Sequence, residues 1–233
     1  MKKILFVLLT LSFVLSLCLF VGCKKQGKTP QKQGLERKVS TYQDGVFVGA
    51  NEEFGVSFVT GEKEKLIVID GAVGEMIPFA TLTVTPLSSA LFNNTYTYRL
   101  VGEKGEKTGD LVKDVIGATF SAEVTGADEI GKILSATVLS EGILESEVPL
   151  LDKLDGALSW REILAVAEKE LKEEITEESD TDNLQREIYV KLVNALSDSE
   201  APYYYYVSFM KSPSDYWALL LDPVTGEVVS KKV

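Results

Sequence analysis

The chain has 233 residues, of which 45% are hydrophobic and 25% charged, a composition typical of a folded protein with one large or two small domains. Its formal net charge of -11 argues against a nucleic-acid-binding protein, because such proteins present a basic surface to the phosphates. The chain contains no His, and its two Cys, Cys18 and Cys23, lie within and at the end of an apolar N-terminal segment. Ser-His-Asp triads, Cys nucleophiles and Cys/His zinc sites are therefore excluded from the folded part.

The N-terminus predicts export. Lys2 and Lys3 precede an apolar run over residues 4–22, which as a helix would be about 28 Å long, nearly the thickness of a bilayer core. The run ends in Phe20-Val21-Gly22-Cys23, which resembles the bacterial lipobox, where a small residue precedes the lipidated cysteine. The resemblance implies a signal peptide over residues 1–22 and lipidation of Cys23, with an uncleaved membrane anchor as the alternative. Both readings place the folded part outside the cytoplasm, anchored to the cell membrane or the outer membrane.

A flexible basic tether is expected over residues 23–40, since this segment has no periodic apolar face. It holds one acid, Glu36, and these basic residues: Lys24, Lys25, Lys28, Lys32, Arg37 and Lys38. An anionic lipid surface attracts such a segment, by roughly 1 kcal/mol for each basic residue. A solvated spacer without membrane contact explains the same composition.

Short strands dominate the expected N-terminal domain, residues 41–150. Apolar side chains alternate with hydroxyl or charged ones in Thr81–Thr85 and Thr95–Leu100, which is the pattern of a half-buried sheet. Glycine, proline and asparagine separate the strands at turns. The pattern predicts strands at Val46–Ala50, Val56–Thr60, Leu66–Ile69, Thr81–Thr85, Thr95–Val101, Thr119–Val124 and Leu134–Leu139.

The period changes beyond Leu150–Gly156, which predicts a second domain over residues 151–233. Ser159-Trp160-Arg161-Glu162 fits a capping box, in which the Ser hydroxyl and the Glu carboxylate satisfy amides at a helix start. Apolar residues then recur at steps of three and four as far as Ile175, as expected of an amphipathic helix.

A second helix is expected to begin at Asp182, with its apolar face on Leu184, Ile188, Leu192 and Leu196. Three strands follow in the prediction: Tyr203–Met210, Tyr216–Leu221 and Val228–Val233. The expected fold class is therefore α+β, with a β-rich N-terminal domain followed by a helix-helix-strand-strand-strand C-terminal domain.

The N-terminal domain carries a resemblance at both ends. Tyr42-Gln43-Asp44-Gly45-Val46-Phe47-Val48-Gly49 resembles the opening of the FMN-binding domain of flavin-bearing subunits in ion-pumping quinone reductases and of related exported lipoproteins. The motif that closes this family is similar to Gly117-Ala118-Thr119, so the resemblance covers about residues 41–137. It implies an FMN site at Gly117, Ala118 and Thr119, with Thr119 as the residue that takes FMN in covalent members. The alternative is structural, a turn glycine before a β-favouring threonine.

The C-terminal domain is similar to PepSY-type domains over about residues 157–233. The likeness rests on Asp222-Pro223-Val224-Thr225-Gly226-Glu227 between two strands, with an amphipathic helix earlier in the domain. It implies a module that binds or restrains other proteins of the cell envelope rather than an enzyme. Asp222, Thr225 and Gly226 are themselves explained as turn formers.

Four consecutive tyrosines, Tyr203–Tyr206, suggest an aromatic platform for a sugar or a peptide. Side chains alternate along a strand, so Tyr203 and Tyr205 are expected on one face and Tyr204 and Tyr206 on the other. One of the two pairs is expected to pack under the helices.

Together these patterns predict a membrane-anchored extracytoplasmic lipoprotein that binds rather than catalyses. In the first reading it holds FMN for electron transfer, with an electron-transfer protein as its partner. In the alternative it is a flavin-free lipoprotein that interacts with another envelope protein. No nucleophile and base can be named, so no catalytic residue is assigned, and neither a metal nor a nucleic acid is expected.

Overall fold

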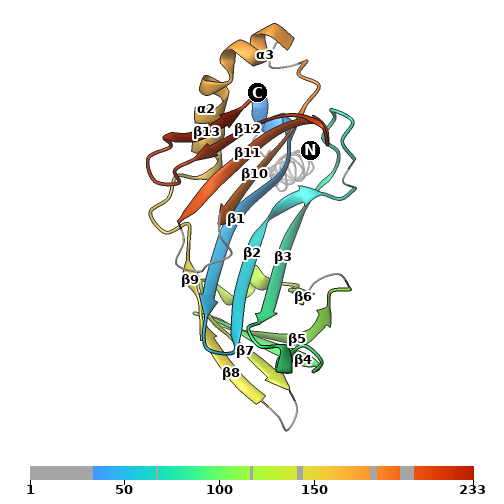
Figure 1. Cartoon of the computed structure of the whole chain (residues 1–233), viewed down its shortest axis with the longest axis vertical. Coiled ribbons are helices and arrows are strands. Elements are labelled where there is room, and N and C mark those ends of the chain that lie inside the picture. The colour runs from blue at the N-terminus through green and yellow to red at the C-terminus, as the bar shows by residue number, and fades with distance from the viewer. Residues whose placement is uncertain (1–33, 67, 116–117, 141–143, 179–182, 195–201) are drawn as a thin grey trace, which may run out of the picture. The chain divides into compact units, whose positions relative to one another are not determined.

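The computed structural model describes residues 34–233, apart from 67, 116–117, 141–143, 179–182 and 195–201 (Figure 1). The strands of this part of the chain are β1 (Val39–Ala50), β2 (Phe54–Glu64), β3 (Met76–Pro86), β4 (Tyr96–Gly102), β5 (Gly105–Lys113), β6 (Phe120–Glu123), β7 (Ile133–Ser140), β8 (Leu144–Pro149), β9 (Leu151–Asp152), β10 (Glu187–Asn194), β11 (Tyr203–Ser212), β12 (Asp215–Leu221) and β13 (Val228–Lys232). The helices are α2 (Trp160–Glu170), α3 (Lys172–Glu178) and three short 3-10 turns, η2 (Gly34–Lys38), η3 (Ser89–Leu91) and η4 (Ala127–Ile130).

The described strands form one mixed sheet in the order β13-β12-β11-β10-β1-β2-β3-β6-β5-β4-β7-β8, with β9 paired to β1. β1 pairs in parallel with β10, and its pairing with β2 is antiparallel. β1 therefore joins the C-terminal strands to the rest of the sheet. The expected α+β class is wrong, because the described residues are mostly strand and contain two α-helices.

The first predicted helix is confirmed as α2. Ser159 caps it as expected: the Glu162 amide donates to Ser159 Oγ, and the Ser159 amide donates to Glu162 Oε2 at 2.8 Å. The helix buries the apolar side that the periodicity predicts, namely Trp160, Ile163, Leu164 and Ala167. A one-residue break at Leu171 separates it from α3.

The second predicted helix is wrong, since its residues form strand β10. Ile188 and Leu192 are four residues apart and both buried, as the predicted helix requires. Val190, midway between them, is buried in the same core, as expected of alternate residues in a strand. Positions four apart share a face in a strand as well as in a helix, so the spacing alone does not separate the two. The β-branched and aromatic residues from Ile188 to Val193 favour the strand. Leu196 lies outside the described residues.

The predicted strand at Leu66–Ile69 is also wrong. β2 ends at Glu64, and the chain closes a loop in which the Lys65 amide donates to Glu75 O at 2.9 Å. The Glu64 carboxylate accepts a hydrogen bond from the Gly74 amide, which holds the other side of the loop. Leu66 and Val68 are exposed there, without a sheet neighbour to bury them.

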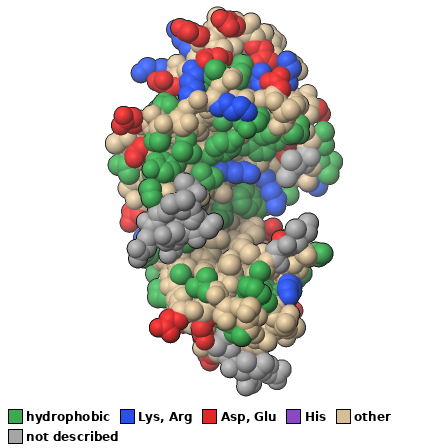
Figure 2. All heavy atoms as spheres, in the orientation of Figure 1, with side chains coloured by type: hydrophobic (Ala, Val, Ile, Leu, Met, Phe, Trp, Pro, Cys, Tyr) green, Lys and Arg blue, Asp and Glu red, His purple; other side chains and the backbone are tan. Residues whose placement is uncertain are grey.

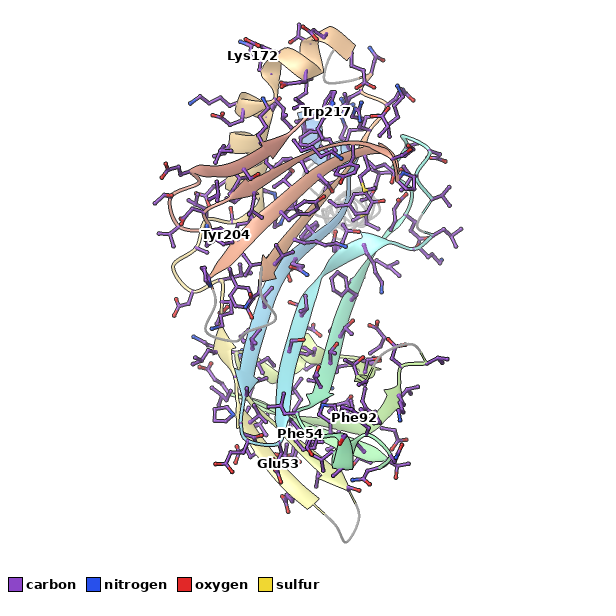
Figure 3. The ribbon with its side chains drawn as sticks, viewed as in Figure 1. Glu53, Phe54, Phe92, Lys172, Tyr204 and Trp217 are labelled. Carbon is purple, nitrogen blue, oxygen red and sulfur yellow. The ribbon has the colours of Figure 1, made fainter. Side chains whose placement is uncertain are left out.

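Two apolar cores stabilise the described chain. The C-terminal core lies between α2 and the strands β1 and β10–β12, where Tyr42 stacks on Trp160 with ring centroids 4.2 Å apart. The N-terminal core lies among β1–β8 and contains Phe54, labelled in Figure 3, which meets Tyr96 edge-on at 5.5 Å. β1 contributes Val46 to the C-terminal core and Phe47 to the N-terminal one. Tyr42 and Val46 of the expected N-terminal domain thus pack in the C-terminal core. The expected flexible tether over residues 23–40 is wrong at its C-terminal end, because Leu35 of η2 and Val39 of β1 are buried in the same core.

Arg186 ties the end of α3 to the β11–β12 hairpin. Its Nε donates to Glu178 Oε2 at 2.6 Å and its Nη1 to Asp215 Oδ1 at 2.9 Å. The guanidinium carbon lies 3.9 Å from the centre of the Trp217 ring. Since the Arg186 side chain is only 6% exposed, water cannot replace these partners.

Replacing Arg186 with Met is therefore expected to lower the free energy of unfolding by about 3 kcal/mol, because it removes a buried guanidinium together with its charged hydrogen bonds to Glu178 and Asp215 and its contact with Trp217. Urea unfolding measures the loss. The matched control is Arg99→Met, since Arg99 pairs with Glu145 at 3.0 Å in an exposed setting and its loss is expected to cost under about 1 kcal/mol. Equal losses in the two variants would contradict the role given to Arg186.

Candidate functional site

A cavity of about 620 Å³ lies between the middle of β1, β2 and β3 and the segment that runs from β6 through η4 to β7. This volume falls within the range of small-molecule sites, about 300–1,000 Å³. Its apolar walls include Phe47, Phe58, Pro78, Phe79, Val124 and Ile133.

An irregularity in β1 shapes this cavity. The β1–β2 register shifts between Gln43 and Gly45, so Asp44 is an extra residue without a directly opposed partner. Two glycines in the wall allow β1 and β2 to approach closely at this irregularity: a Cβ atom on Gly45 would collide with the Thr60 hydroxyl, and one on Gly61 with the Tyr42 carbonyl. Beyond the bulge, Phe47 lies opposite Phe58, with ring centroids 6.2 Å apart.

The charged side chains that line the cavity are all acidic: Asp44, Glu123 and Asp128. Asp44 Oδ1 accepts a hydrogen bond from Thr60 Oγ1 at 2.7 Å, and Glu123 Oε1 accepts one from Thr81 Oγ1 at 3.1 Å. No Lys or Arg belongs to the described lining. The cavity therefore combines aromatic walls with an excess of negative charge.

The contacts of Lys63 show that the edge of this cavity can bind an ammonium group. Its Nζ lies 3.7 Å from Glu123 Oε1 and 5.2 Å from the centre of the Phe79 ring, and both of these residues line the cavity. An ammonium here gains from the carboxylate and from the face of the ring at once. Lys63 carries one positive charge beside three carboxylates of the lining, so it neutralises only part of the acidic charge.

The residues expected to hold FMN lie elsewhere. Ala118 is exposed and Thr119 half-buried in the turn between β5 and β6, where the Thr119 carbonyl accepts a hydrogen bond from the Asp114 amide at 2.9 Å. Neither lines the cavity. Gly117 and the lipidation residue Cys23 lie outside the described residues. The structure thus does not bring Ala118 or Thr119 to the cavity, and the flavin assignment stays a prediction.

The tyrosine run alternates as predicted. Tyr205 is buried, its hydroxyl donates to the Leu158 carbonyl at 2.9 Å, and burial raises its pKa to about 12. Tyr203 packs beside it against the C-terminal core. Tyr204 and Tyr206 point to the opposite side of β11 and remain half-exposed. One pair therefore packs under the helical layer, as expected.

The acidic lining was not predicted as a site. Asp44 belongs to the flavin-like opening, and nothing in the sequence relates it to Glu123 or Asp128, which lie on separate elements. The available signal was a Gly next to an acid in a strand, Asp44-Gly45, which is typical of a bulge as well as of a turn.

Comparison with protein families, with curated proteins and with solved structures found no match for this chain. Among the described residues, no helix is both long and apolar enough to cross a bilayer.

Proposed function

We propose that the chain is an exported, lipid-anchored binding protein that holds a small organic cation in the cavity between β1–β3 and η4. The observation that carries this proposal is the cavity lining, in which Phe47, Phe58 and Phe79 accompany carboxylates and no basic residue. The basic n-region and the lipobox-like Phe20-Val21-Gly22-Cys23 support export and anchoring.

The lining favours a ligand with an apolar body and a positive group. Aromatic faces and carboxylates both attract an ammonium, and the walls offer apolar surface for the remainder of the molecule. An anionic ligand would have to approach Asp44, Glu123 and Asp128 without a basic partner in the described lining, which disfavours its binding. The phosphate of FMN falls in that disfavoured class. Binding without turnover agrees with the absence of His and of a thiol beyond Cys23.

Calorimetric titration with tryptamine, an aromatic amine that is a cation at pH 7, tests the proposal on the chain from Lys24 onward. Both cores lie between residues 35 and 221, so this chain contains all of the packing that stabilises the fold. We expect saturable binding that the double variant Asp44→Asn/Glu123→Gln weakens about tenfold, because two charges near the ammonium are lost. Both amides can still accept the hydrogen bonds from Thr60 and Thr81.

The matched control is the double variant Glu106→Gln/Asp110→Asn on β5. Both residues are exposed and do not line the cavity, so this variant loses two negative charges from the surface without touching the site. Its affinity for tryptamine is expected to equal that of the parent chain. Equal weakening by the control, or no binding of tryptamine to the parent chain, would overturn the proposal.

A further inference from the structure

The C-terminal sheet has a second apolar face, on the side opposite α2. The pairing of β10, β11 and β12 places Tyr206 opposite Leu220 and Met210 opposite Tyr216. We call six large side chains on this side of the three strands the tyrosine face: Tyr189, Tyr204, Tyr206, Met210, Tyr216 and Leu220. Tyr189 is buried, as are Glu187, Ser208 and Ala218 on the same side, while the other five members are partly exposed. Figure 2 shows hydrophobic side chains gathered over these strands, and Figure 3 labels Tyr204 on β11.

The tyrosine face is as rich in large side chains as the buried side of the same strands. Tyr205, Val207 and Phe209 are buried on the helix side of β11, whereas Tyr204, Tyr206 and Met210 on the other side are half-exposed. The segment 203–210 contains no charged residue, which is typical of a strand buried on both faces. Such a sheet is normally covered by a layer on each side. Here α2 covers one side, and no described helix supplies the other.

The surroundings of the face raise the pKa of two of its tyrosines. Burial raises the pKa of Tyr206, and the neighbouring Tyr216 raises it further. Burial and then the Glu187 carboxylate raise the pKa of Tyr189 to about 12. These hydroxyls therefore stay neutral at physiological pH, and the face presents uncharged rings with polar tips.

Lysines flank the tyrosine face on both sides. Lys191 on β10 places its Nζ 5.8 Å from the centre of the Tyr189 ring, and Lys232 on β13 places its Nζ 3.3 Å from the centre of the Tyr216 ring. β10 and β13 are the outer strands of the four that run from β10 to β13. No ion pair with a described carboxylate involves either ammonium. This basic border is local, because the whole chain has a net charge of -11.

From these observations we propose that the tyrosine face docks an amphipathic helix of a partner protein, with an apolar stripe against the tyrosines and acidic residues along both flanks. α2 shows that the opposite side of these strands already packs a helix through Ile163, Leu164 and Ala167. The lysines on the two flanks complement acids at the two borders of the helical stripe. This inference does not depend on the cavity, because none of the residues of the tyrosine face lines it.

The chain's own apolar segment, residues 4–22, could also cover the tyrosine face, but its charges fit the face less well than those of an acidic partner helix. Lys2 and Lys3 precede this segment and Lys24 and Lys25 follow it, so that its flanks repel the lysines of the face. A bilayer is the other alternative, because tyrosines and lysines also suit a lipid interface. The exposed rings of the face are partly covered by their own neighbours, so they do not protrude as side chains that insert into a bilayer do. This favours a helix that lies across the rings over a membrane.

The test uses two fluorescently labelled peptides of about five helical turns, each with the same leucine stripe and either Glu or Lys at all flanking positions. Anisotropy is measured with the chain from Lys24 onward. The Glu peptide is expected to bind at least about tenfold more tightly than the Lys peptide. Tyr204→Ser/Tyr206→Ser is expected to weaken the Glu peptide about tenfold, because the aromatic anchors are lost.

Reversing the charge of the two flanking lysines is the most decisive part of this experiment. Lys191→Glu/Lys232→Glu is expected to exchange the preference, so that the Lys peptide binds more tightly than the Glu peptide. The control, Lys104→Glu/Lys132→Glu, changes the total charge equally at exposed positions near the β4–β5 turn and before β7, and should leave the preference unchanged.

Each contrary result overturns the inference. Equal affinity for the two peptides, or equal effects of the two charge reversals, would show that the lysines of the face do not select the partner. The face would be assigned to a membrane if the chain bound anionic phosphatidylglycerol vesicles but neither peptide, and if this binding required Tyr204 and Tyr206. Peptide binding that requires removal of residues 1–23 from the full chain would assign it to the chain's own N-terminus.

Discussion

Replacing Glu187 with Leu is expected to lower the free energy of unfolding by about 4 kcal/mol, the largest loss that we expect from a single side chain in the described fold. Glu187 is fully buried at the start of β10. Its Oε1 accepts from the amides of Asp70 and Gly71 at 2.8 and 3.1 Å. Its Oε2 accepts from Ser40 Oγ at 2.9 Å and from the Tyr189 hydroxyl at 3.2 Å. Leucine leaves the two amides without an acceptor and removes the carboxylate oxygen shared by the two hydroxyls.

Urea unfolding at constant pH measures the loss, and Glu187→Gln is the matched variant. Glutamine keeps one carbonyl oxygen for the Asp70 and Gly71 amides, and its NH2 group can donate to the two hydroxyls, which also accept. We therefore expect Glu187→Gln to cost about half as much as Glu187→Leu. A leucine variant within about 1 kcal/mol of the parent chain would show that water replaces Glu187 in the loop after β2.

Replacing Cys23 with Ser is expected to abolish lipid attachment completely, because serine lacks the thiol that the lipobox-like motif presents. The measurement is incorporation of labelled palmitate into the full chain expressed in a bacterial host, together with its distribution between membrane and soluble fractions. The parent chain should carry the label and sediment with membranes. Cys18→Ser is the control, since Cys18 lies within the apolar run and its loss should leave labelling unchanged. Label in the Cys23→Ser chain would contradict the lipid anchor.

Membrane association without label in either chain would point instead to an uncleaved anchor over residues 4–22. That outcome leaves the folded part on the same side of the membrane but removes the lipid. It would not affect the cavity or the tyrosine face, which both lie within residues 39–232.

Local signals predicted much of the secondary structure. The capping box at Ser159 and the apolar face from Trp160 predicted α2 because both depend on residues within a few positions of one another. β10 was mistaken for a helix because Ile188 and Leu192 satisfy both periods. The parallel pairing of β10 with β1 joins residues about 150 positions apart, and no local pattern specifies it.

The candidate site depends on the same long-range pairing. Asp44 enters the cavity because the β1–β2 register shifts at Gly45, while Glu123 and Asp128 come from β6 and η4. Each residue has an ordinary explanation when read alone, as an acid in a turn or at a strand end. The tyrosine run was easier, since alternation along one strand predicts that Tyr205 is buried and that Tyr204 and Tyr206 face away.

The most direct test of the proposed function compares tryptamine with indole-3-acetate in calorimetric titrations of the parent chain. The two probes share the indole ring and differ in the sign of the charge, so size and apolar burial are matched. The acidic lining predicts that tryptamine binds at least about tenfold more tightly and that added salt narrows the difference. Equal binding of the two, or tighter binding of indole-3-acetate, would contradict a site selective for organic cations.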